Sequence, residues 1–139
     1  MKIFQYKLHI PKVEEFGIVN ITQDVKDKVK ESGIKSGIAN VFVVGATGAV
    51  TTIEFEKGLI EDFKSFLSRT VPKNSNYLHN RTHAVGNAHS HILASILGPS
   101  LCVPVIDGEA LLGTWQQVVI INFDSRPRDR NVVISVIGE

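Results

Sequence analysis

The chain has 139 residues, of which 43% are hydrophobic and 21% are charged, a composition typical of one globular domain. Its 15 Lys and Arg residues and 14 Asp and Glu residues leave a formal net charge of +1, which does not favour nucleic acid as a partner. No segment approaches the ~20 apolar residues of a membrane span. We therefore expect a single domain, residues 1–139, in the cytoplasm, with neither a membrane nor a nucleic-acid partner.

The first half of the chain predicts a strand, then a helix, then a β-hairpin. Residues 2–10 alternate in polarity and predict a strand that ends at Pro11. Thr22 suits a helix N-cap and Gly33 a helix stop, so a short surface helix is expected between them. The β-branched runs "IANVFVVG" and "AVTTIEF" are joined by "GATG" and predict a β-hairpin.

Two helices and a β-rich end follow. Apolar residues recur at helical spacing in "GLIEDFKSFLSRTVP", which predicts an amphipathic helix that covers a sheet face and ends before Pro72. Asn87 is expected to cap a second helix, which stops at Gly98. Asp107-Gly108 predicts a type I′ hairpin, and "QQVVIINF" and "NVVISVIG" predict two further strands. The expected fold class is α+β, with a mainly antiparallel β-sheet and two or three helices.

The single cysteine, Cys102, lies in the apolar segment "SLCVPV". One cysteine cannot form a disulfide within the chain. We expect a buried structural thiol and a reducing compartment.

Four of the five histidines lie in "YLHNRTHAVGNAHSH". A helix start favours neutral imidazoles, which bind metals, and its free N–H groups attract phosphate. His89 and His91 can share one ion only if His89 precedes the helix, while the loop can return His79 to His91. His83 lies in the middle of this loop. A shared site is favoured over a solvated loop with isolated histidines.

Three further groups of polar residues are candidates for a site. Thr52, Glu54 and Glu56 share one face of the predicted strand, either as part of a metal or acid–base site or as an ordinary solvent face. The arginines of "SRPRDR" can bind phosphate, although pairing with Asp124 and Asp129 is the favoured interpretation. The segment "GTWQQ" places Thr114 and Gln116 beside Trp115, a residue type that is more often core or interface than ligand platform.

The strings "YLHN", "HSHILASILGPSL" and "VPVIDGEALLGTWQQVVIINFD", with "TTIEFEKGL" before them and "ISVIGE" at the end, closely resemble the YjbQ-type family of secondary thiamine-phosphate synthases. The resemblance implies an α+β homotrimer with sites near subunit contacts. It also implies a weak ability to join a hydroxymethylpyrimidine diphosphate to a thiazole phosphate, releasing pyrophosphate. His83 and Val85 depart from the family pattern, in which an aromatic and an acidic residue are usual, so Val85 changes the coordination if that acid binds a metal.

With this family in view, a site for a divalent metal, Zn²⁺ or Mg²⁺, and a phosphorylated small substrate is expected. The expected metal ligands are His79, His89 and His91, and the expected catalytic residues are His79, His91 and Glu54. The expected substrate-binding residues are Thr47, Asn87, Thr114, Gln116 and Arg128. Two hypotheses are open: a metal-dependent enzyme of this kind, or a trimeric metal- or anion-binding protein whose catalysis is incidental.

Overall fold

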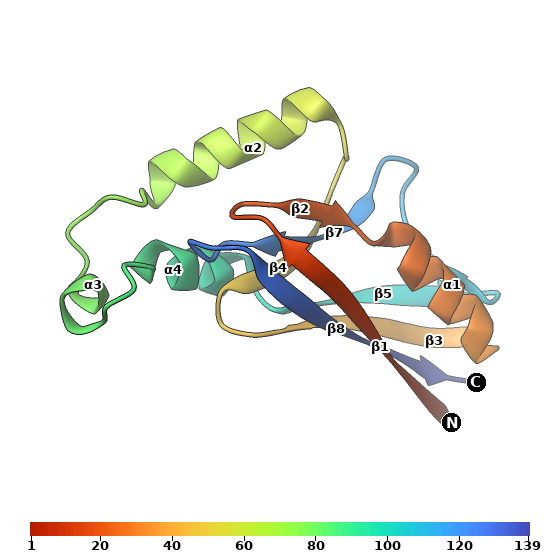
Figure 1. Ribbon diagram of the computed structural model, residues 1–139. Helices are drawn as coiled ribbons and strands as arrows, with labels where there is room; N and C mark the ends of the chain where they lie inside the picture. Colours follow the sequence, from red (N-terminus) through yellow and green to blue (C-terminus); the bar gives the residue numbers. More distant parts are fainter.

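The computed structural model describes all 139 residues, Met1–Glu139. Eight strands and four helices follow one another along the chain (Figure 1). The strands are β1 (Lys2–Val13), β2 (Ile18–Asn20), β3 (Ser36–Val44), β4 (Gly48–Ile53), β5 (Ser100–Ile106), β6 (Glu109–Ala110), β7 (Gln117–Asn122) and β8 (Arg128–Gly138). The helices are α1 (Thr22–Ser32), α2 (Lys57–Thr70), α3 (Leu78–Thr82) and α4 (Ala88–Leu97).

The strands form two sheets, and every pair is antiparallel. The larger sheet has the order β1-β8-β3-β5-β6 and the smaller one β2-β7-β4. This confirms the expected α+β class with a mainly antiparallel sheet. The helices number four rather than two or three, because the short α3 interrupts the histidine loop.

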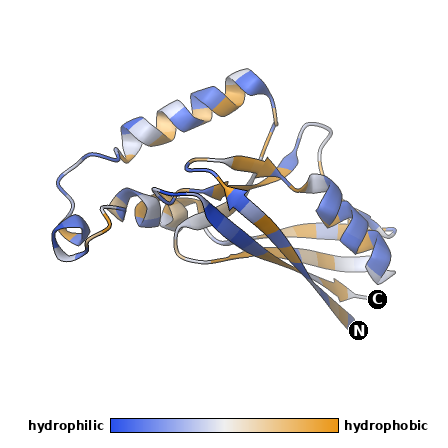
Figure 2. Ribbon diagram, viewed as in Figure 1, coloured by the Kyte–Doolittle hydropathy of each residue, from blue (hydrophilic) through white to orange (hydrophobic).

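Strand β7 joins the two hydrophobic cores, because its alternate residues point to opposite faces of the small sheet. Val118 and Ile120 belong to the core between the sheets, which also contains inward residues of β8 and α1. Ile121 packs on the other side with Phe123 and Leu93, in a second core beneath α2 and α4. The order of layers is therefore the large sheet, the small sheet, and then α2 and α4, while α1 packs against the core between the sheets. Figure 2 shows hydrophobic residues along the central strands and in bands on α2.

The predicted hairpin between residues 38 and 55 is wrong. β3 pairs with β5 and β8, whereas β4 pairs with β7 in the other sheet. The connecting loop crosses between the layers instead of reversing within one. Thr47 in this loop accepts a hydrogen bond from the backbone N–H of Phe123 at 2.8 Å, so the crossing is tied to the end of β7.

Local features of β1, α1 and β5 also differ from expectation. β1 continues through Pro11 to Val13, with a shift of register between Ile10 and Val13. Proline is tolerated there because β1 is an edge strand of the sheet. Thr22 is the first residue of α1 rather than its cap, and its hydroxyl bonds to β7, whereas Gly33 ends the helix as predicted, with φ of 72°. Cys102 is exposed, not buried, because alternation on β5 turns its neighbour Val103 inward.

The remaining element predictions are confirmed. The α2 and α4 helices end before Pro72 and at Gly98, and Asp107-Gly108 form a hairpin turn with φ of 53° and 80°. The second strand of this hairpin, β6, has two residues and ends at Ala110. No helix is both long and apolar enough to span a bilayer.

Candidate functional site

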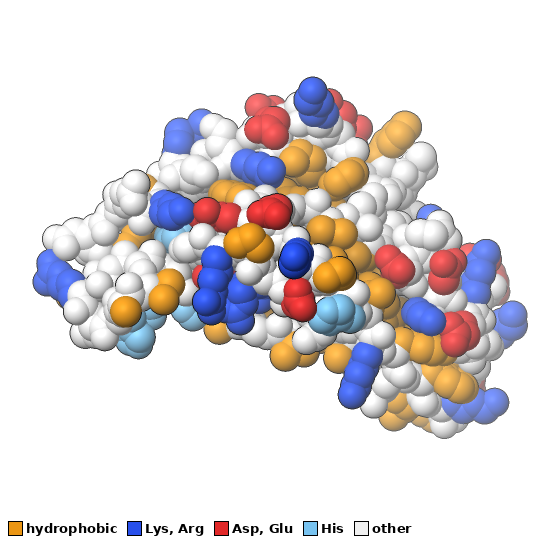
Figure 3. All heavy atoms as spheres, viewed as in Figure 1, with side chains coloured by type: hydrophobic (Ala, Val, Ile, Leu, Met, Phe, Trp, Pro, Cys, Tyr) orange, Lys and Arg blue, Asp and Glu red, His pale blue; other side chains and the backbone are white.

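Three histidines meet where α3 faces the start of α4. The rings of His79 and His91 have centroids 5.1 Å apart and are tilted by 55°. The ring of His83 stacks on that of His79, with centroids 4.2 Å apart and planes 6° from parallel. The three side chains line an open hollow of about 400 Å³ together with Val85 and Asn87. Figure 3 shows histidine side chains gathered at the α3 end of the molecule, next to Lys and Arg side chains.

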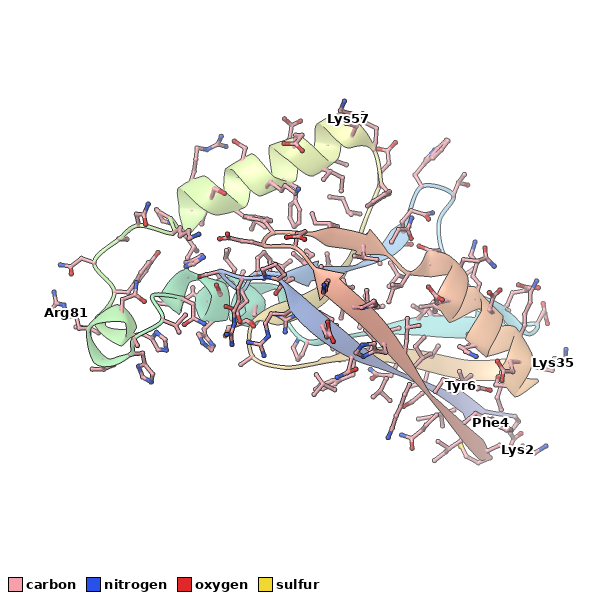
Figure 4. The ribbon with its side chains drawn as sticks, viewed as in Figure 1. Lys2, Phe4, Tyr6, Lys35, Lys57 and Arg81 are labelled. Carbon is pink, nitrogen blue, oxygen red and sulfur yellow. The ribbon has the colours of Figure 1, made fainter.

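Two asparagines close the histidine loop. Asn87 was expected to cap α4, but its side chain makes no capping bond. Asn80 of α3 does so instead, because its Oδ1 accepts from the N–H of Ala88 at 3.1 Å. This bond fixes α3 against the start of α4 and so brings His79 back to His91. Arg81 projects outward from α3 (Figure 4), where its Nη2 donates to Asn76.

His89 belongs to a different environment. It is the second residue of α4, so it does not precede the helix, and it lines an internal cavity rather than the hollow of His91. Burial lowers its pKa, and the nearby positive charge of Lys73 lowers it further, which keeps the imidazole neutral. Within one chain, His89 therefore does not complete a metal site with His79 and His91.

Asp124 forms the centre of a buried polar network beside the histidines. It is 2% exposed, and its carboxylate accepts from Ser125 N at 2.8 Å, Arg128 Nη1 at 3.0 Å, Thr47 Oγ1 at 3.3 Å and Asn87 Nδ2 at 3.4 Å. Burial alone would raise its pKa, but these donors together hold the pKa of Asp124 below its usual value. The carboxylate is therefore ionised, and both of its oxygens accept hydrogen bonds.

Arg130 extends this network into the core. Its guanidinium is 2% exposed and donates to Thr47 Oγ1 at 2.8 Å and to Asn122 Oδ1. Burial and the neighbouring charge of Arg128 lower the pKa of Arg130. A Cβ at Gly48 would lie 3.1 Å from the guanidinium, so the start of β4 can approach Arg130 this closely because glycine occupies that position.

Arg128 is the member of this network that can meet a ligand. Its side chain is 42% exposed while one guanidinium nitrogen is held by Asp124, in agreement with the favoured pairing. The other donors of a planar guanidinium remain available to an anion. The N-terminus of α4, whose first N–H groups carry partial positive charge, adds to this preference for an anion.

Two other predicted site residues, Glu54 and Thr114, lie in a second hollow. Glu54, Thr114 and Trp115 line an open pocket of about 370 Å³, and Gln116 next to it bonds to Thr52 and Gly113. Glu54 follows the end of β4, whereas Gly48 at its start borders His91. Six residues of strand separate the two ends by roughly 20 Å, so one chain does not bring Glu54 to the histidines.

Glu56 has a structural task that the sequence pattern did not predict. The strand ends at Ile53, so the alternation of Thr52, Glu54 and Glu56 on one strand face does not occur. Glu56 caps α2 instead, because its carboxylate accepts from the N–H groups of Gly58 and Leu59 at 2.8 and 2.7 Å. These two bonds lower the pKa of Glu56.

His79 and His91 meet some of the requirements of a metal site. In the chain, no group of three or more His, Cys, Asp or Glu side chains is arranged to hold a metal. However, Nδ1 of His79 is buried without a hydrogen-bond partner. A tetrahedral Zn²⁺ with Zn–N bonds of about 2.0 Å would hold two ring centroids about 5 Å apart, close to the 5.1 Å between His79 and His91. His83 cannot ligate the same ion, because an ion lies in the plane of each ligating ring and the parallel planes of His79 and His83 share no point.

Sequence reasoning missed the central place of Asp124 and the roles of Asn80 and Asn122. One signal was present: Asn122 and Asp124 are polar residues at the end of an otherwise apolar run and, two apart, share one face. A polar pair that points inward from a buried strand requires buried partners.

These features define an α+β protein of two stacked antiparallel sheets, with a candidate site of histidine and arginine residues at the edge where α3, α4 and the end of β7 meet. Residues 6–139 match the family described as "UPF0047 protein YjbQ-like", and the chain belongs to this family.

Relatives match nearly end to end. A UPF0047 protein of Methanothermobacter thermautotrophicus is 37% identical over 139 residues, covering 100% of this chain and 95% of the relative. One of Methanocaldococcus jannaschii is 36% identical over 138 residues, covering 99% and 95%. A crystal structure of a YbjQ-like protein of unknown function from Sulfolobus solfataricus P2 aligns with a TM-score of 0.94 at 31% identity and covers 99% of both chains.

Proposed function

We propose that the protein binds a phosphorylated small molecule together with a divalent metal at the centre formed by His79, His91 and Arg128. The observation that carries the proposal is the buried, unpartnered Nδ1 of His79 beside His91. Asn87, which lines the same hollow, shares the carboxylate of Asp124 with the half-exposed Arg128. Metals recruit such imidazoles, and arginine binds phosphate. His79 and His91 would hold the ion, and its remaining positions would be open to phosphate oxygen and water.

The reaction that fits this centre is the one implied by the family likeness. The bond between the methylene carbon of a hydroxymethylpyrimidine diphosphate and its leaving oxygen breaks, and the electron pair departs with pyrophosphate. The thiazole nitrogen then donates its lone pair to the carbon, forming thiamine phosphate. A bound divalent ion would neutralise charge on the leaving group. Arg128 would orient and stabilise the same phosphates, and the positive end of the α4 helix dipole would add to this attraction.

The proposed assembly is a cytoplasmic homotrimer with sites near subunit contacts. Catalysis by Glu54 then requires that it reach the histidine centre from a neighbouring subunit, since it lies roughly 20 Å from that centre along its own strand. Thr114 and Gln116, which adjoin Glu54, would contribute to substrate binding by the same route.

A second candidate function is a trimeric protein that binds a metal or anion without turnover. One observation favours it: the carboxylate nearest the network, Asp124, is buried and occupied by four donors. It is therefore not free to act as a general base.

Pyrophosphate release from the two phosphorylated substrates, with Mg²⁺ or Zn²⁺ supplied, tests the proposal. Arg128→Gln should reduce the rate by about tenfold or more, the value of one charge-assisted contact to phosphate. The exposed Arg126→Gln serves as the matched control in the same loop, and thermal unfolding of both variants checks the fold. If Arg128→Gln and Arg126→Gln were equally active, the arginine would have no part in the reaction. Substrate binding by calorimetry without pyrophosphate release would favour the binding protein.

A further inference from the structure

The second hollow, on the side of the molecule away from α3, combines exposed aromatic rings with carboxylates. It has a volume of about 370 Å³ and is lined mainly by the loop between β6 and β7 and by the chain that leaves β4. Figure 1 shows these two segments side by side near the start of α2. Within one chain the hollow is separate from the histidine centre, which lies roughly 20 Å away at the other end of β4.

Two aromatic residues of this hollow are open to solvent. Trp115, the only tryptophan of the chain, is 71% exposed, and Phe55 is 47% exposed. Tryptophan is highly buried on average in folded proteins, so this exposure excludes the core position that its residue type favours. The face of an aromatic ring carries partial negative charge and attracts a cation that lies over it, most strongly for tryptophan. The open ring of Trp115 therefore offers a surface to an organic cation.

The charges around the hollow are all negative. Glu54 and Glu56 are its ionisable lining residues, and no Lys, Arg or His lines it. The carboxylate of Glu56 is occupied, since it caps α2. Glu54 is exposed and belongs to none of the ion pairs of the chain. Lys57, close by in sequence, projects from the start of α2 away from the sheets (Figure 4). A cation that enters the hollow therefore meets a free carboxylate and no positive charge.

We propose that this hollow binds a small organic cation, such as a quaternary ammonium ion or a positively charged heteroaromatic ring, against Trp115 with Glu54 as its counter-ion. The volume lies within the range of about 300–1,000 Å³ that is usual for small-molecule sites. Aromatic rings are the usual means by which proteins recognise quaternary ammonium groups. The remaining lining is neutral, since Asn20 Nδ2 donates to Gln117 Oε1 at 3.2 Å.

This inference does not rest on the proposed function, because cation binding here requires neither a metal nor a phosphate. The two are related at one point. Alkylation of the thiazole nitrogen in the proposed reaction leaves the ring positively charged, so the product carries a group of the proposed class. Their failures are distinguishable, because a cation titration measures this hollow alone and pyrophosphate release measures the reaction.

Choline is the probe, and its matched control is the uncharged alcohol in which a carbon atom replaces the nitrogen of choline. Because the chain has a single tryptophan, its fluorescence reports on this hollow directly. At constant ionic strength, choline should change the emission of Trp115 saturably. The alcohol should bind about tenfold more weakly, since it keeps the shape and loses the attraction to the ring and the carboxylate. Added NaCl should weaken choline binding, because salt screens exposed charges.

Glu54→Gln removes the counter-ion and should weaken choline binding about threefold, the value of one exposed ion pair. Glu61→Gln is the matched control, because Glu61 is an exposed residue of α2 that does not line the hollow, and it should leave choline binding unchanged. Saturation-transfer NMR of the choline methyl protons replaces fluorescence for Trp115→Leu, which should lose binding.

Thermal unfolding checks the fold of the three variants, and the comparison of choline with its carbon analogue in the unmodified protein decides the matter if a variant fails to fold. The proposal is overturned if choline and the analogue bind the unmodified protein equally. It is also overturned if Trp115→Leu binds choline as tightly as the unmodified protein, or if Glu54→Gln and Glu61→Gln lose affinity equally.

Discussion

Replacing Asp124 by Asn should destabilise the protein severely, although the two side chains have nearly the same shape. Four donors converge on this carboxylate, among them the charged Arg128 and the backbone N–H of Ser125. Thr47, a third donor, links it to the buried Arg130. Asparagine gives up the negative charge and one acceptor oxygen, and it turns an N–H₂ group towards groups that themselves donate.

The size of the expected loss of stability follows from the burial of the charges involved. Removing one partner of a buried charge pair costs about 3–5 kcal/mol. Here the buried charge left behind is the 2% exposed Arg130, which Thr47 links to Asp124 without direct contact between the two charges. Arg130 retains Asn122 as an acceptor, so we expect a loss near the lower end, about 3 kcal/mol. Domains of this size have about 5–15 kcal/mol in total, so the variant should fold with greatly reduced stability.

Urea unfolding followed by circular dichroism measures this loss as a lower midpoint at constant slope. Asp129→Asn is the matched control. That carboxylate is 55% exposed and pairs with His9 at 3.4 Å, so its replacement should cost about 1 kcal/mol or less. A loss below about 1 kcal/mol for Asp124→Asn would refute the reasoning that the buried carboxylate compensates Arg130.

Low pH should destabilise the protein through protonation of Asp124. The pKa of Asp124 is lower in the folded than in the unfolded protein, so its contribution to the free energy of unfolding is complete above about pH 3.9 and is lost as pH falls through the folded pKa. Asp124→Asn should therefore flatten the pH dependence of stability below about pH 4. An unchanged slope would contradict this. Gly37→Ala should prevent folding or cost more than about 3 kcal/mol, because its Cβ would lie 1.9 Å from the carbonyl oxygen of Ile137, and a normal urea midpoint would show that the strands move apart freely. In a homotrimer with shared sites, Glu54→Gln and His91→Ala chains that are each inactive should regain part of the activity when refolded together; light scattering that gives a monomer, or no recovery on mixing, would contradict that arrangement.

Local elements were predicted well from the sequence where the hydrophobic periodicity agreed with helix-stop and turn residues. α2 and its end before Pro72, and the Asp107-Gly108 turn, follow from residue preferences that act over a few positions. The β3–β4 hairpin failed because glycines in "GATG" permit both a tight turn and a crossing between layers. The crossing is selected by distant contacts, such as the bond from Phe123 to Thr47.

The parts of the candidate site that are built from residues close together in the sequence were predictable, and the parts built from distant residues were not. The facing of His79 and His91 follows from a loop that closes between two helices. The opposite placement of His89 depends on where α4 begins, and a shift of one or two residues at a helix start lies within ordinary uncertainty. The Asp124 network could not be predicted, since its donors Thr47 and Asn87 lie 77 and 37 residues away in sequence.

Calorimetric titration with Zn²⁺ tests the central claim most directly, because it measures the proposed metal centre without assuming a substrate. The unmodified protein should bind one ion for each His79–His91 pair, and His91→Ala should abolish this stoichiometric binding. His83→Ala should retain it, since His83 stacks on His79 and cannot share its ion. No binding by the unmodified protein, or equal loss in the two variants, would contradict the account.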